Sequence, residues 1–492
     1  MPANRLYLAG DWRQGRGAEI TSRFPADQSL NAVINGASRQ DALEAIAAAK
    51  RAQAATGWAD LMPHERARYL ARIADGIEAS ADRIAFVQSR DTGKTLTETR
   101  ALAGSAAATF RYFAAACETR EEALTPSRGP YLTFSLYEPL GVVAAITPWN
   151  SPIASDAQKI APALAAGNAV VLKPASWSPL TCLELARVID EAGLPKGLFS
   201  TLPGSGAEIG DLLVEHPDID RVSFTGGTAT GRRIAEKAAR KLMPVSLELG
   251  GKSPTILFDD CDEDLAIAGI LFGMFSSSGQ SCIAGSRLFV PEAMWARFVP
   301  RLVAATEALV TGHPHDPATQ VAPLIHPDHR AEVAAMVDAA VADGARVLTG
   351  GKAPDDPALA EGTYYLPTIL SGVSNEATIC REEIFGPVLV VLPYKDEADV
   401  IAQANDNDYG LACGLWSRDF NRCWRVARAI RSGTVWINTY KQFSISTPFG
   451  GEKASGTGRE KGREGLLAYM RQKTLFHDTS ERPHPWARWP RI

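Results

Sequence analysis

Short apolar stretches alternate with helix-forming stretches between residues 142 and 438 of this 492-residue chain, and this alternation constrains its fold most strongly. The expected strands are 142–146, 169–172, 222–224, 245–249, 255–258, 288–290, 365–370, 388–394 and 435–438. Helical patterns fill the intervals, as at 180–192, 262–275 and 328–343. Alternating units of this length predict an α/β fold in which helices cover the faces of parallel sheets.

The chain is long enough for two or three domains, since an ordinary domain has about 100–200 residues. Glycines 250 and 251 lie between two series of α/β units, and the backbone freedom of paired glycines suits a boundary there. Short strands are expected over 5–35. Ser38 followed by Asp41 then predicts a helix start, because their side chains can cap the first turn.

Composition excludes several classes of partner. The net charge of −5 provides no basic surface for nucleic acid or for an anionic membrane. No leader pattern opens the chain and no apolar run approaches a transmembrane length, so we expect a cytoplasmic protein. The seven cysteines are odd in number and widely spaced, which argues against disulfides and against a metal site. Small polar molecules are the expected ligands.

Cys282 is the first candidate for chemistry. It lies among small residues in Ser281-Cys282-Ile283-Ala284-Gly285, after an apolar helical pattern and before a strand pattern. A thiol attacks as its thiolate and needs an open approach and a neighbour that takes its proton. Taken alone, however, a cysteine is more often a small buried apolar residue. The rest of the chain has to decide between these interpretations.

Glycines follow the expected strand at 222–224 and suggest a phosphate site. The dinucleotide fingerprint GxGxxG is absent after every expected strand. Gly226 and Gly231 have the spacing of a P-loop, but Arg232 and Arg233 stand where lysine and a hydroxyl residue are needed, so an ATP site of the kinase type is not expected. These glycines could still bring backbone close to a pyrophosphate at a helix N-terminus, or could form only a structural turn.

Polar side chains follow three other expected strands. Asn150 comes after the strand at 142–146, Lys173 ends the next strand, and Glu248 lies at the end of a third. Ligands of open α/β sheets bind at the carboxyl ends of strands. Asn150 could donate to an oxyanion there, and Lys173 could reach ribose hydroxyls or phosphate. Each residue by itself also fits a solvated loop.

Taken together, these segments resemble the aldehyde dehydrogenase superfamily, in family order and over nearly the whole chain. The matching stretches are Pro148-Trp149-Asn150, Lys173-Pro174-Ala175, Phe224-Thr225-Gly226 with Gly231, Leu247-Glu248-Leu249-Gly250-Gly251-Lys252, Gly279-Gln280-Ser281-Cys282, Glu383-Ile384-Phe385-Gly386-Pro387, Pro448-Phe449-Gly450-Gly451 and Ser455-Gly456 with Gly458-Arg459-Glu460. Agreement of this extent favours Cys282 as a nucleophile.

The resemblance implies oxidation of an aldehyde to a carboxylic acid with NAD or NADP. Cys282 would attack the aldehyde carbon, and the Asn150 amide and the Cys282 backbone N–H would hold the oxyanion of the thiohemiacetal. Glu248 would then activate the water that hydrolyses the thioester. Lys159 and Glu460 are implied as a proton relay with Glu248.

The resemblance also implies a set of cofactor contacts. Lys173 would bind the adenosine ribose and Glu383 the nicotinamide ribose. The remaining cofactor contacts implied by the family are Trp149, Gly226, Gly231 and Phe385. Ser176 departs from the pattern, since many NAD-preferring members carry glutamate three residues after the lysine. A carboxylate would repel a 2′-phosphate and serine would not, so NADP stays open.

The expected substrate pocket departs from the family as well. Ser151 and Gln158 stand where members that prefer apolar aldehydes often have aromatic residues. Phe443 and Phe449 remain as aromatic walls beside Ile283. A wider or more polar tunnel suggests a semialdehyde or a hydroxyaldehyde as the substrate.

Three alternatives remain at this point. In a CoA-acylating semialdehyde dehydrogenase, CoA would resolve the thioester instead of water, although a positioned base such as Glu248 favours water. A cofactor-free thioesterase or esterase would use the same cysteine without NAD(P). A binding protein would keep the fold without the chemistry, although the joint presence of Cys282, Glu248 and Asn150 argues against it.

The resemblance predicts a Rossmann-like cofactor domain (1–121 and 142–249), an α/β catalytic domain (250–450) and a small β oligomerisation arm (122–141 and 464–492). The alternating strand at 131–138 fits such an arm, because a strand at a sheet edge needs a partner for its backbone groups. We therefore expect a homodimer or a homotetramer.

Overall fold

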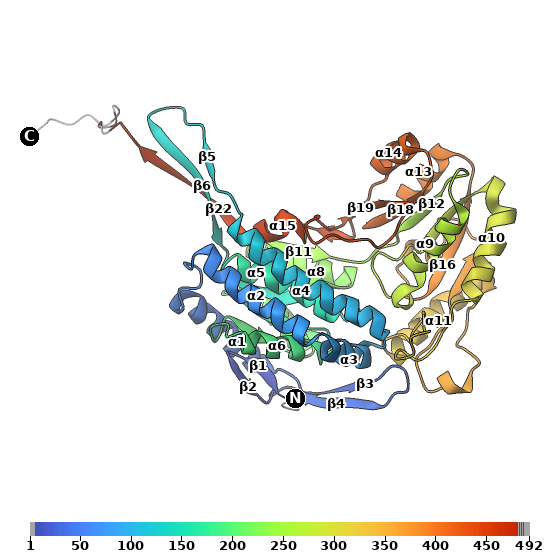
Figure 1. The fold of residues 1–492 in the computed structure, drawn as a ribbon, viewed down its shortest axis with the longest axis horizontal. Helices are drawn as coiled ribbons and strands as arrows, with labels where there is room; N and C mark the ends of the chain where they lie inside the picture. Colours follow the sequence, from blue (N-terminus) through green and yellow to red (C-terminus); the bar gives the residue numbers. More distant parts are fainter. Residues whose placement is uncertain (1–4, 481, 483, 485, 487–492) are drawn as a thin grey trace, which may run out of the picture.

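The computed structural model describes residues 5–480, 482, 484 and 486. Two α/β units lie side by side, and a narrow β arm extends away from them (Figure 1). The predicted α/β class is confirmed. No helix in the described part of the chain is long and apolar enough to span a membrane. The same residues contain no cluster of three or more histidine, cysteine or acidic side chains that could hold a metal ion.

The first unit is built on a six-stranded sheet. Its strands, in spatial order, are β21 (Gly456–Thr457), β11 (Val245–Glu248), β10 (Arg221–Thr225), β7 (Val142–Ile146), β8 (Ala169–Lys173) and β9 (Phe199–Thr201). All neighbours pair in parallel except β21 with β11. Strands β7 and β8 are buried along their whole length, which explains their continuous apolar sequences.

Helices surround this first sheet. They are α1 (Arg39–Ala55), α2 (Pro63–Ala79), α3 (Ala81–Thr92), α4 (Leu96–Glu118), α5 (Pro152–Ala165), α6 (Thr181–Glu191), α7 (Asp211–Glu215) and α8 (Thr228–Ala239). Helix α5 contacts β7 and β8, and α8 contacts β10 and β11. The predicted cap of α1 is confirmed, because the Ser38 side chain accepts from the Asp41 N–H and the Asp41 carboxylate accepts from the Ser38 N–H.

The second unit is built on a seven-stranded sheet. Its order is β14 (Arg346–Thr349), β15 (Thr368–Ser371), β16 (Val388–Tyr394), β13 (Arg287–Pro291), β12 (Pro254–Leu257), β18 (Ala412–Trp416) and β19 (Thr434–Ile437). Its helices are α9 (Glu263–Phe275), α10 (Glu292–Glu307), α11 (Pro327–Ala342), α12 (Thr378–Arg381), α13 (Glu397–Asn405) and α14 (Phe420–Ala429). Only β14 runs antiparallel to its neighbour.

The sequence pattern missed β18, although this strand lies between β12 and β19. Its centre is Cys413-Gly414, and a glycine lowers the strand propensity of a short stretch. The tertiary structure requires that glycine, since a Cβ at residue 414 would lie 2.6 Å from a ring carbon of Tyr440.

A three-stranded antiparallel sheet forms the arm. Strand β6 (Tyr131–Pro139) pairs with β5 (Ala123–Thr125) on one side and with β22 (Met470–Asp478) on the other. The strand expected over 131–138 therefore obtains its partners within the same chain. Exposed apolar side chains remain on the arm, namely Leu124, Leu132, Leu475 and Phe476. Part of the predicted arm segment 464–492 lies outside the described residues, and the division into domains remains a prediction.

Smaller elements complete the described part of the chain. They are β1 (Leu6–Leu8), β2 (Asp11–Arg13), β3 (Glu19–Arg23), β4 (Leu30–Asn35), β17 (Tyr409–Gly410), β20 (Glu452–Lys453), α15 (Gly462–Leu467) and the single turns Gly206–Gly210, Ser276–Gly279 and Pro357–Leu359. Helix α15 contacts α4 and α5. It carries the end of the chain from the second unit back to the first.

Candidate active site

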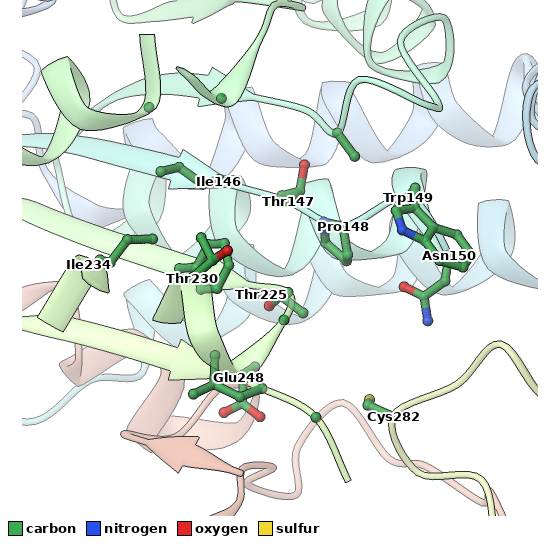
Figure 2. Close-up of a pocket in the computed structure, with 18 of the residues that line it drawn as sticks. Ile146, Thr147, Pro148, Trp149, Asn150, Thr225, Thr230, Ile234, Glu248 and Cys282 are labelled. Carbon is green, nitrogen blue, oxygen red and sulfur yellow. The ribbon is translucent and has the colours of Figure 1, made fainter. Parts of the chain in front are cut away.

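A cavity of about 410 Å³ opens at the carboxyl ends of β7, β8, β10 and β11 (Figure 2). The first unit contributes the segment from Ile146 to Asn150, Lys173 and Glu248 to its lining. The second unit contributes Cys282 and Glu383. Residues from both series of α/β units therefore meet around one space.

The Cys282 loop is held tightly between the two units. After α9 ends, Ser277, Ser278 and Gly279 adopt positive φ angles of 58°, 54° and 69°. A Cβ on Gly279 would lie 2.1 Å from the carbonyl oxygen of Gly386, in the second unit. A Cβ on Gly251 would lie 2.2 Å from the carbonyl oxygen of Cys282. These two glycines are therefore required for close backbone approach, which fixes the position of Cys282.

Cys282 differs from the other six cysteines of the chain. Each of those is buried, whereas Cys282 is half-buried and lines the cavity. Burial raises the pKa of its thiol to about 12, and the nearby Glu383 and Glu248 act in the same direction. The thiol is therefore protonated at neutral pH, and its attack requires an acceptor for the proton.

The Asn150 side chain reaches the same loop. Its Nδ2 donates to the carbonyl oxygen of Gln280 at 3.0 Å, although the two residues are 130 positions apart. Gln280 is held in turn, because its Oε1 accepts from the Ile325 N–H at 2.9 Å. Figure 2 shows Asn150 directed toward Cys282, with Glu248 at the end of β11.

Glu248 is the last residue of β11 and is buried. Neither of its carboxylate oxygens has a hydrogen-bond partner among the described residues. Burial raises the pKa of this carboxyl well above its usual value, and Glu460 adds to the increase. A buried acid without a partner destabilises the fold, and acids of this kind are frequent at catalytic sites.

Lys159 and Glu460, the two residues of the expected proton relay, meet in the interior. The Lys159 Nζ donates to the Ser223 Oγ at 3.1 Å and forms an ion pair with the Glu460 carboxylate. Gln158, which we expected in the substrate pocket, donates its amide to the same carboxylate. The charge of Glu460 also raises the pKa of Glu248, although no hydrogen bond joins the two carboxyl groups.

The side chains expected to bind the cofactor ribose groups are buried or half-buried on the cavity wall. Burial lowers the pKa of Lys173 to about 8, and its Nζ donates to the Pro174 carbonyl oxygen at 3.0 Å. The Glu383 Oε1 accepts from the Gly251 N–H at 2.9 Å, and burial raises the pKa of this carboxyl to about 7.

The expected glycines divide between two roles. Gly226 lines the cavity and donates its N–H to the Glu248 carbonyl oxygen at 3.0 Å. Gly227 begins α8, and a Cβ there would meet no atom within 4 Å. Gly231 is absent from the cavity wall and packs against Leu249, since a Cβ would come 2.4 Å from its side chain. Gly231 therefore presents no surface in this cavity for the pyrophosphate contact that we expected of it.

Aromatic rings enclose one side of the cavity. The Trp149 ring makes an edge contact with Phe385 at a centroid distance of 5.1 Å, and the Phe385 backbone has a positive φ of 56°. Trp177 and His329 belong to the same cluster and were missed by the sequence reasoning. Only the proximity of their segments in the fold identifies them.

Ser176 lies next to this cavity but not on its wall, which includes its neighbours Ala175 and Trp177. It is exposed, donates its hydroxyl to the Gly204 carbonyl oxygen at 3.1 Å, and lines an adjoining cavity of about 290 Å³. Glu19 and Glu208 also line that adjoining cavity.

The expected substrate residues lie outside the cofactor cavity. Cys282 and Phe449 pack against an apolar cluster that contains Ile283 and Trp436. Phe443 is 47% exposed and makes edge contacts with Phe449 and Trp436, each at a centroid distance of 5.5 Å. Ser151, like these residues, is not part of the cavity wall. Cys282 therefore lies between the cofactor cavity and the apolar cluster that contains Ile283 and Trp436.

The cavity fits a nicotinamide dinucleotide. The backbone amides at the N-terminus of α8 face a space without side chains at Gly227, which suits a pyrophosphate. The buried Lys173 and the half-buried Glu383 provide a donor and an acceptor for ribose hydroxyls. An NAD(P)-dependent dehydrogenase is the class that this fold and this site define.

Comparisons with known proteins agree with that class. The family model "Aldehyde dehydrogenase family" matches residues 12–475. The chain is 40% identical to betaine aldehyde dehydrogenase of Bacillus subtilis (strain 168) over 483 residues, covering 98% of this chain and 99% of the relative. The chain belongs to the aldehyde dehydrogenase family, and it oxidises an aldehyde with NAD or NADP as the cofactor.

Solved structures show the same similarity. Betaine aldehyde dehydrogenase from Staphylococcus aureus, in complex with NAD+ and with a BME-modified cysteine, has a TM-score of 0.96 at 36% identity, covering 99% of this chain and 98% of that one. A putative aldehyde dehydrogenase from Burkholderia cenocepacia has a TM-score of 0.96 at 39% identity, covering 99% of both chains.

Proposed function

We propose that Cys282 is the nucleophile of this aldehyde dehydrogenase. Its sulfur forms a bond to the aldehyde carbon, the carbonyl becomes an oxyanion, and the thiol proton passes to Glu248 directly or through water. NAD(P)+ supplies the acceptor for the hydride that leaves this carbon. The product of this stage is a thioester on Cys282. The meeting of Cys282, Asn150 and Glu248 at one cavity carries the proposal.

Glu248 then activates water for hydrolysis of the thioester. Water adds to the acyl carbon, the carbon–sulfur bond breaks, and the carboxylic acid and the free thiol are released. The absence of a hydrogen-bond partner for the Glu248 carboxylate in the described part of the chain leaves both oxygens available. A buried base at this position favours water over CoA as the acceptor. The pair of Lys159 and Glu460 would carry the proton away from Glu248, which restores the base for the next turnover.

The test of this function is a panel of aldehydes assayed for NADH and NADPH formation separately. We expect reduced cofactor and carboxylic acid to form in equal amounts. Acid formation without added NAD(P) would instead indicate a thioesterase or esterase. Product formation that requires CoA would indicate the acylating reaction.

Asn150→Ala is expected to lower kcat by roughly 10²–10³-fold, the usual cost of losing one donor to an oxyanion. The Asn150 amide already lies beside the Cys282 loop, so the change removes a donor from a preformed site. Steady-state kinetics with one aldehyde measure the effect. Asn31→Ala, a matched change far from the cavity, serves as the control. A loss of less than threefold in the Asn150 variant would contradict the role.

We propose that both NAD+ and NADP+ are accepted. Ser176 places no carboxylate beside the adenosine ribose, while Glu19 and Glu208 in the adjoining cavity limit the affinity for a phosphate. A kcat/KM for NAD+ that exceeds the value for NADP+ a hundredfold in the native enzyme would contradict this proposal.

Ser176→Glu is expected to lower kcat/KM for NADP+ at least tenfold relative to NAD+, because the new carboxylate would repel the 2′-phosphate and accept from a 2′-hydroxyl. Ser176→Gln has nearly the same size without the charge and is the matched control. Equal losses with both cofactors in the glutamate variant would show that the position does not select between them.

We propose that the substrate is an aldehyde with a polar group of its own. Ser151 and the Gln158 amide replace aromatic rings near the nucleophile, and Gln158 is held by Glu460. Among the similar proteins, those from Bacillus subtilis and Staphylococcus aureus are named for betaine aldehyde, which carries a trimethylammonium group.

We further propose that the β arm joins copies of this chain into a homodimer or a homotetramer. Leu124, Leu132, Leu475 and Phe476 expose apolar surface on an arm that extends away from both α/β units (Figure 1). Light scattering after size-exclusion chromatography measures the mass. A monomer at micromolar concentration would contradict the proposal.

A further inference from the structure

Lys461 brings a positive charge to the substrate side of Cys282. Its Nζ lies 4.1 Å from the centre of the Phe443 ring and 5.7 Å from the centre of the Phe449 ring. Phe449 packs against the same apolar cluster as Cys282, and neither aromatic residue belongs to the cofactor cavity. Burial lowers the pKa of Lys461, while the charges of Glu460, Cys282 and Glu248 act in the opposite direction. The ammonium group thus lies over two aromatic rings, one of which packs against the same cluster as Cys282.

Lys441 provides a second ammonium group near Cys282. Its Nζ donates to the Ser276 Oγ at 2.8 Å, at the start of the segment that leads to the nucleophile. Burial lowers the pKa of Lys441 to about 7, and nearby Lys94 lowers it further, whereas Glu98 and Cys282 raise it. The charged groups around Lys441 thus are one ammonium group and one carboxylate, apart from the thiol.

Both lysines occupy unfavourable backbone conformations. Lys461 has φ 59° and ψ 176°, a combination that is found almost only in glycine. Lys441 has a φ of 53°, in the left-handed region that few residues other than glycine adopt. Strain of this kind persists only where the surrounding structure imposes it, and it is concentrated at functional sites.

Neither ammonium group forms an ion pair with a carboxylate of the described residues. Glu460, the nearest acid in sequence to Lys461, is committed to Lys159 and Gln158. A partly buried cation without a counter-ion lowers the stability of the fold unless a bound anion neutralises its charge. The two lysines therefore have donors on this side of Cys282 that a bound anion could accept from.

We propose, on the basis of the function proposed above, that the substrate is an aldehyde with a carboxylate at its other end, and that Lys461 and Lys441 bind this carboxylate while Cys282 attacks the aldehyde carbon. The walls formed by Phe443 and Phe449 would enclose the methylene groups between the two ends. An ω-oxo carboxylate, or semialdehyde, is the simplest compound of this class.

The same geometry opposes a cationic substrate. A trimethylammonium group is bound through the faces of aromatic rings. In this chain the Lys461 ammonium already lies over the Phe443 ring, and it would repel a second cation. We therefore expect this chain to prefer a different substrate from the one for which those relatives are named.

The test compares three aldehydes of different charge: succinic semialdehyde, butanal and betaine aldehyde. For the native enzyme we expect kcat/KM to be highest for succinic semialdehyde, at least tenfold above butanal, and lowest for betaine aldehyde. In Lys461→Met and in Lys441→Met, the ratio of kcat/KM for succinic semialdehyde to that for butanal should fall at least tenfold. Lys461→Arg should retain most of this ratio, and Lys395→Met, at an exposed position of the second unit, is the matched control.

Lys461→Gly distinguishes the loss of the ammonium group from a folding defect, because glycine tolerates the strained backbone of this position. It should keep the thermal midpoint of the native enzyme and show the same loss of charge discrimination as Lys461→Met. Similar kcat/KM values for the three aldehydes in the native enzyme would overturn the inference. It would also be overturned if the variants lost activity equally with all three aldehydes and reacted more slowly with iodoacetamide, since Lys461 would then support the thiolate.

The failure of this inference is distinguishable from the failure of the proposed function. If none of a wider range of aldehydes gave NADH or NADPH, the function itself would be wrong. If butanal or betaine aldehyde were oxidised as well as succinic semialdehyde, the function would stand and only the role of the two lysines would be wrong.

Discussion

Cys282→Ala is expected to lower the rate of NAD(P)-dependent aldehyde oxidation by roughly 10⁴-fold or more, as found for the loss of catalytic nucleophiles elsewhere. No other cysteine can replace it, because the remaining six are buried and none of them lines the cavity. Without the sulfur no thiohemiacetal forms, and the aldehyde carbon is not activated to release a hydride. The measurement is the absorbance of the reduced cofactor at saturating aldehyde.

Cys117→Ala is the matched control for this prediction. Cys117 is buried in α4, and its thiol donates to the carbonyl oxygens of Pro63 and Ala114, far from the cavity in sequence and in the fold. We expect the control to retain the native kcat. A Cys282→Ala protein that kept more than a tenth of the native rate would show that the central assignment is wrong.

Glu248→Gln is expected to slow steady-state turnover by roughly 10²–10³-fold, within the usual contribution of a general base. Hydrolysis of the thioester needs the base, whereas a thioester can still form when another group or water accepts the thiol proton. Rapid mixing should therefore show a burst of reduced cofactor close to one per active site, followed by slow turnover. Intact-protein mass spectrometry should detect the acyl group on Cys282.

The pH profile gives a second measurement of the same residue. Burial and Glu460 raise the pKa of Glu248, so its deprotonated, active form accumulates only as the pH rises above the usual range of a carboxyl group. The native kcat should accordingly increase with pH through this raised pKa. Glutamine does not titrate, and the variant should lose this limb of the profile.

Glu307→Gln is the control for Glu248, because Glu307 is exposed at the end of α10. It should retain both the native rate and the pH profile. A Glu248→Gln enzyme without a burst, in which hydride transfer and turnover were slowed equally, would assign Glu248 to the first stage instead of to hydrolysis.

Much of the α/β architecture could be predicted from local sequence. Strands β7 and β16 have the predicted bounds, and α9 and α11 differ by one residue at their ends. Continuous apolar runs identify buried parallel strands, and caps identify helix starts. Strand β18 was missed because its Cys413-Gly414 centre has low strand propensity, and its place in the sheet depends on β12 and β19 on either side.

The candidate site could be predicted only in part. The residues of the matched motifs, such as Asn150, Glu248 and Cys282, could be named as candidates because each motif is local in the chain, and the structure brings them to one cavity. Gly231 was expected at the pyrophosphate but packs against Leu249, because packing at α8 depends on a strand distant in sequence. The aromatic residues Trp177 and His329 belong to no motif, and only the fold brings them together with Trp149.

The sequence by itself determined the α/β class and the family resemblance, and it singled out Cys282 as the candidate nucleophile, because these depend on patterns within short stretches. The tertiary structure decided which charges meet around that nucleophile. It brings Lys461 over the ring of Phe443 and leaves Glu248 without a hydrogen-bond partner in the described part of the chain. Burial and electrostatic interaction depend on segments far apart in the chain, so no local pattern could show which charged groups surround Cys282.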